Sequence, residues 1–370
     1  MFPSYLSNYV IYESQTSVEA FWKLEKQRLF LDTPILVVIN ENGQYIGIIT
    51  RGALSRDIMH LDNPMALTAG DVCNRNGRIC IQSANNRTEA LSIFADNELI
   101  CAIPVIDDAK NLTEIVFRQQ VFYRDFYLGM VHGNQKLTMP RMQYARQIYE
   151  AAQLAKTLGF DSFSVIEFGV AGGNGLVACE FHIKEISRLF DLRIELYGFD
   201  SGEGLPDASD HRNASYLWEH GFYQLDVEKL KKRLQFAQLI IGDIGQTAGE
   251  FMQKANFAPI GVMLVDVDFY TSTVPILNML RGATDRFLPR VHMFFHDIGD
   301  YLAHSGEKAA IDEFNACNQD IKLSEYMSHY RELREHQWGE LYCAHLFKHD
   351  KYNINLYKLR TGQLASAPLF

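Results

Sequence analysis

The chain has 370 residues, 47% of them hydrophobic and 22% charged, which is typical of a globular protein. This length exceeds what one hydrophobic core usually supports and predicts two or three domains. With 45 acidic against 35 basic residues, the formal net charge is −10. Such a charge argues against the broad basic surface that nucleic acids require.

The six cysteines, at positions 73, 80, 101, 179, 317 and 343, form no C-x-x-C pair and no zinc-ligand spacing. We expect free thiols, as in a cytoplasmic protein. The first residues lack the basic segment and apolar run of a signal peptide. No stretch approaches the roughly 18 uninterrupted apolar residues of a membrane span, so we expect a cytoplasmic protein without membrane contact.

The first zone, residues 1–120, contains an internal repeat. A helix-like segment over 17–29 precedes two apolar runs that flank the turn ENGQ, a pattern that predicts a β-hairpin. Helical spacing follows over 53–61. The same order then returns as a helix over 88–99, a strand over 101–108, the turn AKN and a strand from residue 112 running into a helix. We predict two copies of a unit of about 60 residues.

Residues 121–160 are interpreted as a helical connector, because MPRMQYARQIYEAAQLAKTLGF has apolar residues at helical intervals and ends in Leu158-Gly159. Residues 161–370 alternate strands with helices, which predicts an α/β, Rossmann-like fold with a seven-stranded, mostly parallel sheet. The expected strands are 164–171, 193–200, 237–243, 261–269, 291–297, 344–350 and 353–359. The last two have no helix between them and suggest an antiparallel hairpin at one edge. In such sheets ligands bind beyond the carboxyl ends of the strands.

A glycine-rich turn follows the first of these strands, with Glu167, Gly169 and Gly173 in the pattern E-x-G-x-x-x-G. Glycines allow a sharp turn and a close approach to a ligand. The next strand ends at Asp200, which can accept both hydroxyls of a ribose. Together these features predict an adenosine-type ligand, although the turn alone might merely connect two elements.

Acidic residues follow the fourth and fifth strands. Asp266 and Asp268 are two apart, so on an extended strand they point the same way. Asp297 and His296 come at the next strand end and can complete the group. Like charges this close call for a divalent cation such as Mg²⁺. The alternative is that these acids cap helices or pair with Arg281 and Arg286.

The pattern from Glu167 to Gly173 resembles motif I of class I S-adenosylmethionine (SAM)-dependent methyltransferases. YGFDSGEGLPD, DVDFYTST and FFHDIGDYLAHSGEKAAIDEF resemble three further segments of the macrocin O-methyltransferase family. The resemblance covers about residues 165–320. It implies a SAM- and Mg²⁺-dependent enzyme that methylates hydroxyls, notably on sugars of natural products.

The resemblance also implies roles for individual residues. The cofactor would be held by the glycine turn, by acids at the strand ends and by the serine after the second strand: Glu167, Gly169, Gly173, Asp200, Ser201 and Asp243. Glu167 would lie near the methionine ammonium and Asp243 near the adenine, unless Asp243 is a helix N-cap. The metal ligands would come from Asp266, Asp268 and Asp297, with catalysis by His296 and Asp268.

Two residues depart from the family pattern. His296 stands where the family has a second aspartate, so it is a metal ligand, the base that removes the hydroxyl proton, or a sign of an altered metal site. Gly202 replaces a phenylalanine, a change expected to widen the pocket over the ligand. Residues 207–224 are an acceptor-binding lid or a surface excursion. The lid candidates are His211, Trp218, His220 and Tyr223.

The first zone resembles a tandem pair of cystathionine-β-synthase (CBS) domains, through PILVVINENGQYIGIITR, TAGDVCNRN and IPVIDD. The ribose-binding acid expected three residues after Thr50 is Ala53 here. We therefore expect a dimerisation or interaction module rather than a nucleotide sensor, and a homodimer formed through it.

The leading hypothesis is a SAM- and Mg²⁺-dependent O-methyltransferase of a small hydroxylated molecule, such as a sugar or a glycosylated metabolite. The alternatives are a SAM-binding regulatory protein without turnover, and a metal-dependent enzyme of the same fold that performs hydroxylation or hydrolysis.

Overall fold

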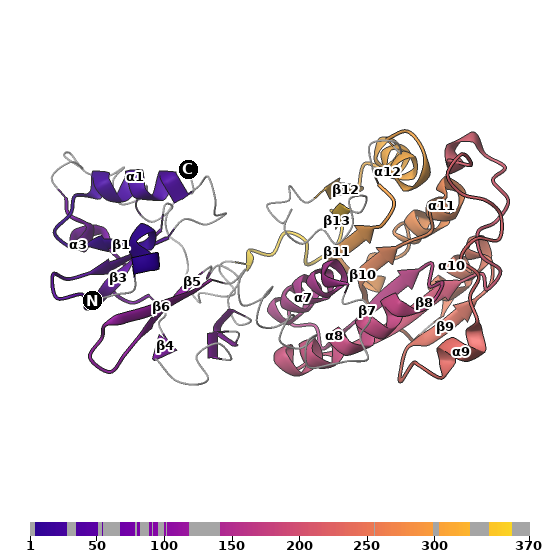
Figure 1. Ribbon diagram of the computed structural model, residues 1–370. Helices are drawn as coiled ribbons and strands as arrows, with labels where there is room; N and C mark the ends of the chain where they lie inside the picture. Colours follow the sequence, from indigo (N-terminus) through magenta and orange to yellow (C-terminus); the bar gives the residue numbers. More distant parts are fainter. Residues whose placement is uncertain are drawn as a thin grey trace. The chain divides into compact units, whose positions relative to one another are not determined.

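The computed structural model describes residues 4–27, 35–50, 54, 67–77, 80–81, 89–90, 92–94, 100, 102–117, 141–254, 256–298, 303–325 and 340–356. The chain divides into two compact units, Met1–Met130 and Val131–Phe370 (Figure 1). Each unit has its own sheets and core, and each is described by itself.

The first unit contains two three-stranded sheets of the same topology. One consists of β1 (Val10–Tyr12), β2 (Ile35–Ile39) and β3 (Tyr45–Thr50), and the other of β4 (Cys80–Ile81), β5 (Ala102–Ile106) and β6 (Leu112–Phe117). In each sheet the first pair is parallel, the second is antiparallel, and the antiparallel register shifts near the end of the middle strand. The predicted internal repeat and its two hairpins are therefore confirmed.

Three short helices belong to the first repeat: η1 (Ser4–Tyr9), α1 (Ser17–Gln27) and α3 (Ala69–Val72). Apolar residues of both repeats pack into one cluster, in which Val37 and Ile39 meet Leu112 and Ile115. The helix predicted over 53–61 lies outside the described residues except for Leu54. The one predicted over 88–99 is helical at the described positions 89–90 and 92–94.

The second unit is built on a seven-stranded sheet in the order β12-β13-β11-β10-β7-β8-β9. Its strands are β7 (Ser162–Phe168), β8 (Arg193–Asp200), β9 (Gln238–Ile241), β10 (Ile260–Val265), β11 (Phe287–Phe295), β12 (Ile321–Glu325) and β13 (Glu340–Leu346). Its helices are α7 (Met142–Thr157), α8 (Asn174–Phe190), η4 (His211–Asn213), α9 (Val227–Lys231), α10 (Ile244–Gln253), α11 (Tyr270–Met279), η5 (Thr284–Arg286) and α12 (Gly306–Cys317).

The sheet is mostly parallel, as predicted, but its last strands differ from the prediction. β13 is antiparallel to both β11 and β12 and lies between them, so it is not an edge strand. β12, over IKLSE, was not predicted. The predicted strand over 353–359 is wrong for its described part, because residues 353–356 form no strand. The short, half-exposed β12 has too few apolar residues to be recognised from its pattern alone.

Helices cover both faces of this sheet. α7 packs on α8 and on β11 and β10, whereas α10, α11 and α12 pack against one another and fill the other face (Figure 1). Between the strands and α10–α12 lies a large cluster of buried side chains that includes Phe199, Phe251, Met263 and Phe295.

The carboxyl ends of the central strands lie level with one another. Phe168 pairs with both Phe199 and Val265, and Val265 pairs with Phe295. Adjacent strands are about 4.8 Å apart, so the residues that follow these positions are brought together at one edge of the sheet.

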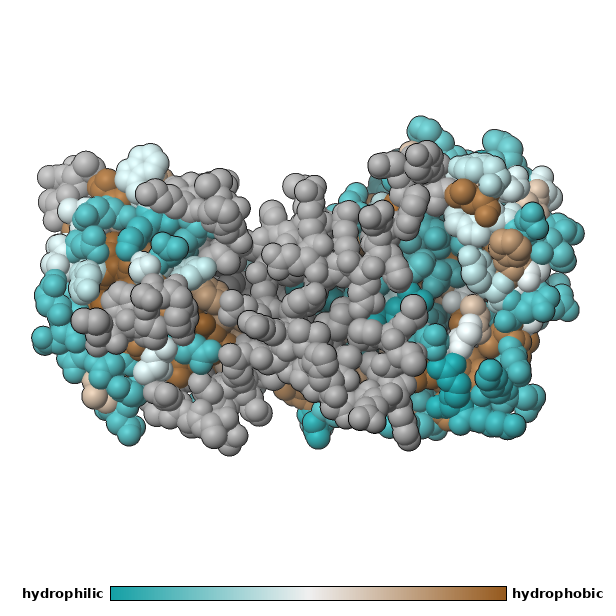
Figure 2. Space-filling model, viewed as in Figure 1, coloured by the Kyte–Doolittle hydropathy of each residue, from teal (hydrophilic) through white to brown (hydrophobic). Residues whose placement is uncertain are grey.

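None of the described helices is both long and apolar enough to cross a membrane. Figure 2 shows hydrophilic residues interspersed with smaller hydrophobic groups over the visible described surface of both units.

Candidate functional site

A cavity of about 310 Å³ opens at the carboxyl ends of β7, β8, β9, β10 and β11. All ten residues singled out from the sequence line it: Glu167, Gly169, Gly173, Asp200, Ser201, Asp243, Asp266, Asp268, His296 and Asp297. The strand ends account for this convergence, because each of these five strands is followed within two residues by a residue of this set. Their roles toward a ligand remain predictions.

The glycine turn after β7 leaves no room for a side chain at Gly169 or Gly173. Gly169 has a φ of +83°, and a Cβ there would lie 1.8 Å from the carbonyl oxygen of Asp266. Gly173 has a φ of +77°, and its Cβ would lie 2.1 Å from Leu230. The turn therefore brings the backbone close to both the next strand end and the cavity, and α8 begins directly after it.

Asp200 holds the glycine turn in place. Its Oδ2 accepts hydrogen bonds from the N–H groups of Val170 and Ala171, both at 2.9 Å, and its Oδ1 accepts one from Gly202 at 2.7 Å. A carboxylate offers about four acceptor positions, so one remains on Oδ1. The expectation that Asp200 accepts the ribose hydroxyls stays a prediction.

Ser201 shapes the next turn, because its Oγ donates to the carbonyl of Gly204 at 2.9 Å and accepts from the N–H of Glu203 at 3.1 Å. Asp243 occupies the N-cap position of α10, but its side chain makes no capping hydrogen bond. Its exposed carboxylate lines the cavity instead. The N-cap alternative is thus correct for the position of Asp243 but not for its side chain.

Glu167 is 2% exposed and is the next-to-last residue of β7, just before the glycine turn. Burial raises the pKa of Glu167 to about 8; the charge of Arg141 opposes this rise, and Asp266 adds to it. Its Oε2 makes no hydrogen bond to any described residue, and its Oε1 would lie 1.7 Å from a Cβ at Gly175. A buried acceptor of this kind is costly unless a donor reaches it, so this carboxyl group suits a cationic or hydrogen-bonding ligand group.

Arg141, which the sequence reasoning missed, also lines the cavity and precedes α7. It is the only arginine or lysine among the described lining residues. Its Nη2 lies 3.8 Å from Oδ2 of Asp266, with the side chain 13% exposed. This separation exceeds the roughly 2.8 Å of a strong charge-assisted hydrogen bond. No sequence pattern distinguishes this arginine, because its neighbours in the cavity follow it by more than twenty positions along the chain.

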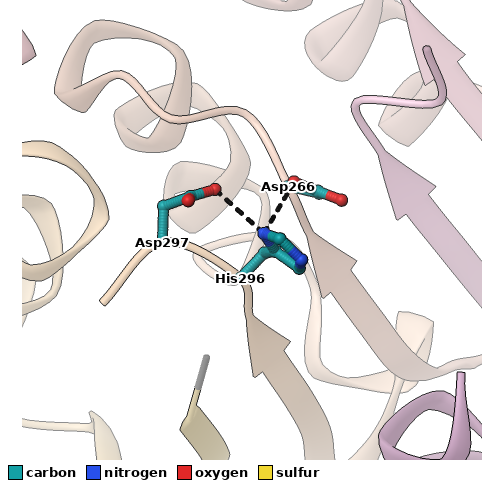
Figure 3. A group of neighbouring side chains, drawn as sticks. All are labelled: Asp266, His296 and Asp297. Atoms are coloured by element: carbon teal, nitrogen blue, oxygen red, sulfur yellow. Dashed lines mark hydrogen bonds and ion pairs between the residues drawn. The ribbon is translucent and has the colours of Figure 1, made fainter. Parts of the chain in front are cut away.

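Asp266, His296 and Asp297 form a compact group that could hold a metal ion. One donor atom from each lies within 4.8 Å of the others. Nδ1 of His296 lies 3.3 Å from Oδ1 of Asp266 and 3.2 Å from Oδ2 of Asp297 (Figure 3). The backbone fixes this arrangement, since the N–H of His296 donates to the carbonyl of Val265 at 2.9 Å.

The charges in this group shift one another's pKa values. Loss of solvent contact raises the pKa of Asp266 to about 6; His296 opposes this rise and Asp297 adds to it. Burial acts to lower the pKa of His296, but the hydrogen bond to Asp297 and the charge of Asp266 outweigh it, so the net shift is upward. A protonated imidazole therefore offsets one of the two carboxylate charges, whereas a divalent cation can offset both.

Asp268 lies close to this group but is not part of it. β10 ends at Val265, and Asp268 adopts a left-handed conformation with a φ of 58°. The argument that Asp266 and Asp268 point the same way on an extended strand is therefore wrong. Asp268 is 6% exposed, and burial together with the charges of Asp297 and Asp266 raises its pKa to about 9.

The proposed pairing of the acids with two arginines is also wrong. Arg281 donates from Nε to Oδ1 of Asn318 at 3.2 Å, and Arg286 donates from Nη1 to the carbonyl of Lys254 at 2.8 Å. The acids at the ends of β10 and β11 therefore face the cavity without either of these cations.

Glu307, at the start of α12, is a buried residue that the sequence reasoning also missed. Its Oε1 accepts from the N–H of Val267 at 3.3 Å, and its Oε2 accepts from the N–H of Asp297 at 3.0 Å. It is fully buried; the burial and the charge of Asp297 raise its pKa well above the usual value. Glu307 thus links the two loops that carry the acids. An acid in the first turn of a helix is too common to single it out.

The segment after β8 is a loop whose ends are joined. Leu205 donates to the carbonyl of Phe222 at 2.8 Å, and Gly221 donates to the carbonyl of Leu205 at 2.9 Å. Of the four lid candidates only Tyr223 lines the cavity, with Phe222 beside it; His211, Trp218 and His220 do not. Tyr223 is 57% exposed and Phe222 43%, so two aromatic side chains stand at the cavity with faces open to solvent.

Comparison with known proteins gives structural neighbours only. No family model matches the chain, and no curated protein matches it. Among solved structures, the O-methyltransferase NovP is similar with a TM-score of 0.39 and 15% identity over 54% of this chain and 79% of that one. The calicheamicin methyltransferase CalS11 has a TM-score of 0.42 and 16% identity over 70% of this chain and 93% of its own.

CBS-domain proteins are among the neighbours as well. CBSX2, solved in complex with AMP, has a TM-score of 0.27 and 19% identity over 32% of this chain and 88% of that one. At such identities and TM-scores we draw nothing about activity from these neighbours, and the assignment below rests on the cavity itself.

Proposed function

We propose that the chain is a SAM- and divalent-cation-dependent O-methyltransferase that acts on a hydroxyl of a small molecule, with a sugar or a glycosylated metabolite as the acceptor class. The observation that carries the proposal is that the glycine turn with its strand-end acids and the Asp266–His296–Asp297 group line one cavity. A methyl donor and a cation-bound acceptor would then lie next to each other.

The residues around the glycine turn fit the donor. SAM would supply an electrophilic methyl group bound to its sulfonium sulfur. After transfer of the methyl group, the rest of the donor leaves as a neutral thioether. The buried Oε2 of Glu167 offers an acceptor for the ammonium of its amino-acid part, and Arg141 is the lining arginine that we assign to its carboxylate. Asp243 presents an exposed carboxylate on the side of β9, where it can accept from an exocyclic amino group.

The group of Asp266, His296 and Asp297 fits a divalent cation, because two carboxylates and an imidazole are common metal ligands and already converge. Mg²⁺ is the ion that the family resemblance implies. When bound, the cation would lower the pKa of the acceptor hydroxyl and fix its orientation.

Asp268 is the residue we assign as general base. Its side chain lines the cavity beside the metal group, and its pKa is raised to about 9. In the metal-free chain a pKa near 9 leaves this group protonated at neutral pH, so it would accept the hydroxyl proton once a bound cation has lowered that pKa. Nδ1 of His296 instead faces Asp266 and Asp297, which favours the metal-ligand role for the imidazole over the role of base.

The aromatic side chains at the cavity support a ring-bearing acceptor. Phe222 and Tyr223 offer flat apolar surfaces, and Leu205 and Pro206 line the same side. A sugar ring has an apolar face that packs on such a surface while its hydroxyls remain available for the cation.

Two measurements test the proposal. Calorimetry with S-adenosylhomocysteine (SAH), the demethylated product, tests the donor site. Incubation with SAM, a divalent cation and a panel of sugars and glycosides, with detection of SAH, tests transfer. Binding without turnover over the whole panel would favour the regulatory alternative, and absence of binding would refute the proposal.

For the first unit we propose a homodimerisation role. The shared core of its two repeats gives it a fold of its own, and sedimentation of the full chain tests this role: a monomer at micromolar concentration would contradict it.

A further inference from the structure

We infer that the cation site selects a first-row transition-metal ion, such as Mn²⁺, Fe²⁺ or Zn²⁺, over Mg²⁺. The inference rests on the proposed function only in that a divalent cation binds between Asp266, His296 and Asp297. It goes beyond the proposed function in assigning the kind of ion, and it depends on the nitrogen donor that His296 contributes.

The pairing of β10 with β11 positions the imidazole of His296 beside Asp266. Asp266 directly follows β10, and His296 directly follows β11. These strands are paired at Val265 and Phe295, and the N–H of His296 donates to the carbonyl of Val265. The strand pairing therefore fixes the backbone position of residue 296. Any residue substituted for His296 would start its side chain from that same position.

The distances suit metal coordination. Two metal–ligand bonds of about 2.1 Å place their donor atoms about 3.0 Å apart at a right angle and about 3.4 Å apart at a tetrahedral angle. The separations from Nδ1 of His296, 3.3 Å to Asp266 and 3.2 Å to Asp297, lie between these values (Figure 3). One ion can touch all three donors with small side-chain movements.

The donor chemistry sets the preference. Mg²⁺ is a hard ion that takes oxygen ligands and retains several waters. Imidazole suits zinc, iron and other transition ions, whose affinity for nitrogen exceeds that of Mg²⁺. One nitrogen among three protein donors therefore weakens Mg²⁺ relative to these ions, whereas three carboxylates would not.

The competing explanation is that a protonated His296 pairs with the two aspartates, offsetting one of their two charges, and no ion binds. A second feature of the cavity favours a bound cation. Beside this group the carboxyl group of Glu167, 2% exposed, has an Oε2 that makes no hydrogen bond to any described residue. The lining contains six acids, against Arg141 and His296 as its basic residues. Even with Glu167 and Asp268 protonated, the four other acids outnumber the two basic residues of the described lining.

The test is a metal-affinity comparison on the full-length, metal-free chain. The affinities for Mn²⁺ and Zn²⁺ are measured by electron paramagnetic resonance and by competition with a chromophoric chelator, and that for Mg²⁺ by displacement of Mn²⁺. The variants are His296→Asp, which makes all three donors oxygen, and His296→Asn, which keeps a neutral oxygen donor. The control is His211→Asp, since His211 lies outside the cavity lining.

We expect the Zn²⁺-to-Mg²⁺ and Mn²⁺-to-Mg²⁺ affinity ratios to fall at least tenfold in a folded His296 variant and to stay unchanged in His211→Asp. Equal ratios in the wild type and the His296 variants, or no ion binding at all, would overturn the inference. SAH calorimetry on the same samples separates the two proposals: SAH binding with unchanged ratios refutes only the metal preference, whereas absent SAH binding refutes the proposed function.

Discussion

Oε2 of Glu307 accepts a hydrogen bond from the backbone N–H of Asp297 at 3.0 Å, while its Oε1 accepts one from Val267. One buried side chain of α12 thus holds the loops that follow β10 and β11, which carry Asp266, Asp268 and Asp297. Glu307 touches no expected ligand, so we regard it as a positioning residue.

Replacing Glu307 tests this role. Glu307→Gln keeps one acceptor but turns the amide NH₂ toward the other N–H, and we expect a loss of about 1–3 kcal/mol in the free energy of unfolding. Cation affinity should fall with it, because the aspartate loops lose a shared anchor. Denaturant unfolding and metal titration measure the two effects. Glu250→Gln, at an exposed position on α10, should change neither; equal effects in both variants would refute the role.

The glycine turn should depend on Asp200. Asp200→Asn cannot accept on both sides of its side chain, so at least one of the hydrogen bonds from Val170, Ala171 and Gly202 is lost. Hydrogen bonds to a charged group contribute about 1.5–3 kcal/mol, so we expect SAH affinity to drop roughly tenfold or more. Calorimetry measures the change. Asp191→Asn, at the end of α8 and exposed, is the matched control, and unaltered SAH binding by Asp200→Asn would contradict the role of the turn.

Arg141 and Glu167 together predict recognition of an amino-acid group. Arg141→Met should weaken SAH binding at least tenfold and leave the binding of 5′-methylthioadenosine, which lacks the amino and carboxylate groups, within about twofold. The control is Arg290→Met, which removes a partly buried arginine outside the cavity lining. A parallel loss of both ligands in Arg141→Met would indicate a structural role instead.

The raised pKa of Asp268 predicts a pH dependence of stability in the metal-free chain. The pKa of Asp268 rises from the ordinary 3.8 to about 9 on folding, so between these values the folded state binds more protons than the unfolded state. Stability must then fall as pH rises through this window. Asp268→Asn should flatten the slope of melting temperature against pH in chelator. A slope that is unchanged, or that rises with pH, would contradict the raised pKa.

Turnover should be lost in the same variant. If Asp268 is the base, Asp268→Asn should lower kcat at least a hundredfold, because general-base catalysis typically contributes about 10²–10⁴-fold. SAH affinity should stay within about twofold of the wild type, since Asp268 touches no part of the donor turn. Retained turnover in Asp268→Asn would remove it as the base.

The strand-end residues were predictable from the sequence because each apolar strand stops at a recognisable polar signal. Glu167 before the glycines, Asp200, and the acids from Asp266 onward all follow runs of buried residues. Parallel strands bring such ends together whatever lies between them. Arg141 and Glu307 could not be predicted in this way, because they lie at the starts of helices. Their hydrogen-bonding and charge partners depend on how these helices pack against the sheet.

Backbone conformation was the second limit. The direction of the Asp268 side chain was inferred for an extended strand, but the residue has a left-handed φ. No residue type reliably indicates a left-handed φ in the sequence. The position of β13 between β11 and β12 likewise depends on tertiary pairing. The sequence pattern of a short antiparallel strand is the same whether it lies at the edge of a sheet or next to the edge strand.

The central claim is that one cavity holds a sulfonium nucleoside and a divalent cation side by side. The most direct measurement is the nuclear relaxation of SAH protons in the presence of the protein and stoichiometric Mn²⁺. Strong, distance-dependent relaxation of the ribose and homocysteine protons, abolished by replacing Asp266 and Asp297 with alanine, is the expected result. SAH that binds with its relaxation unaffected by protein-bound Mn²⁺, or that does not bind, would contradict the claim.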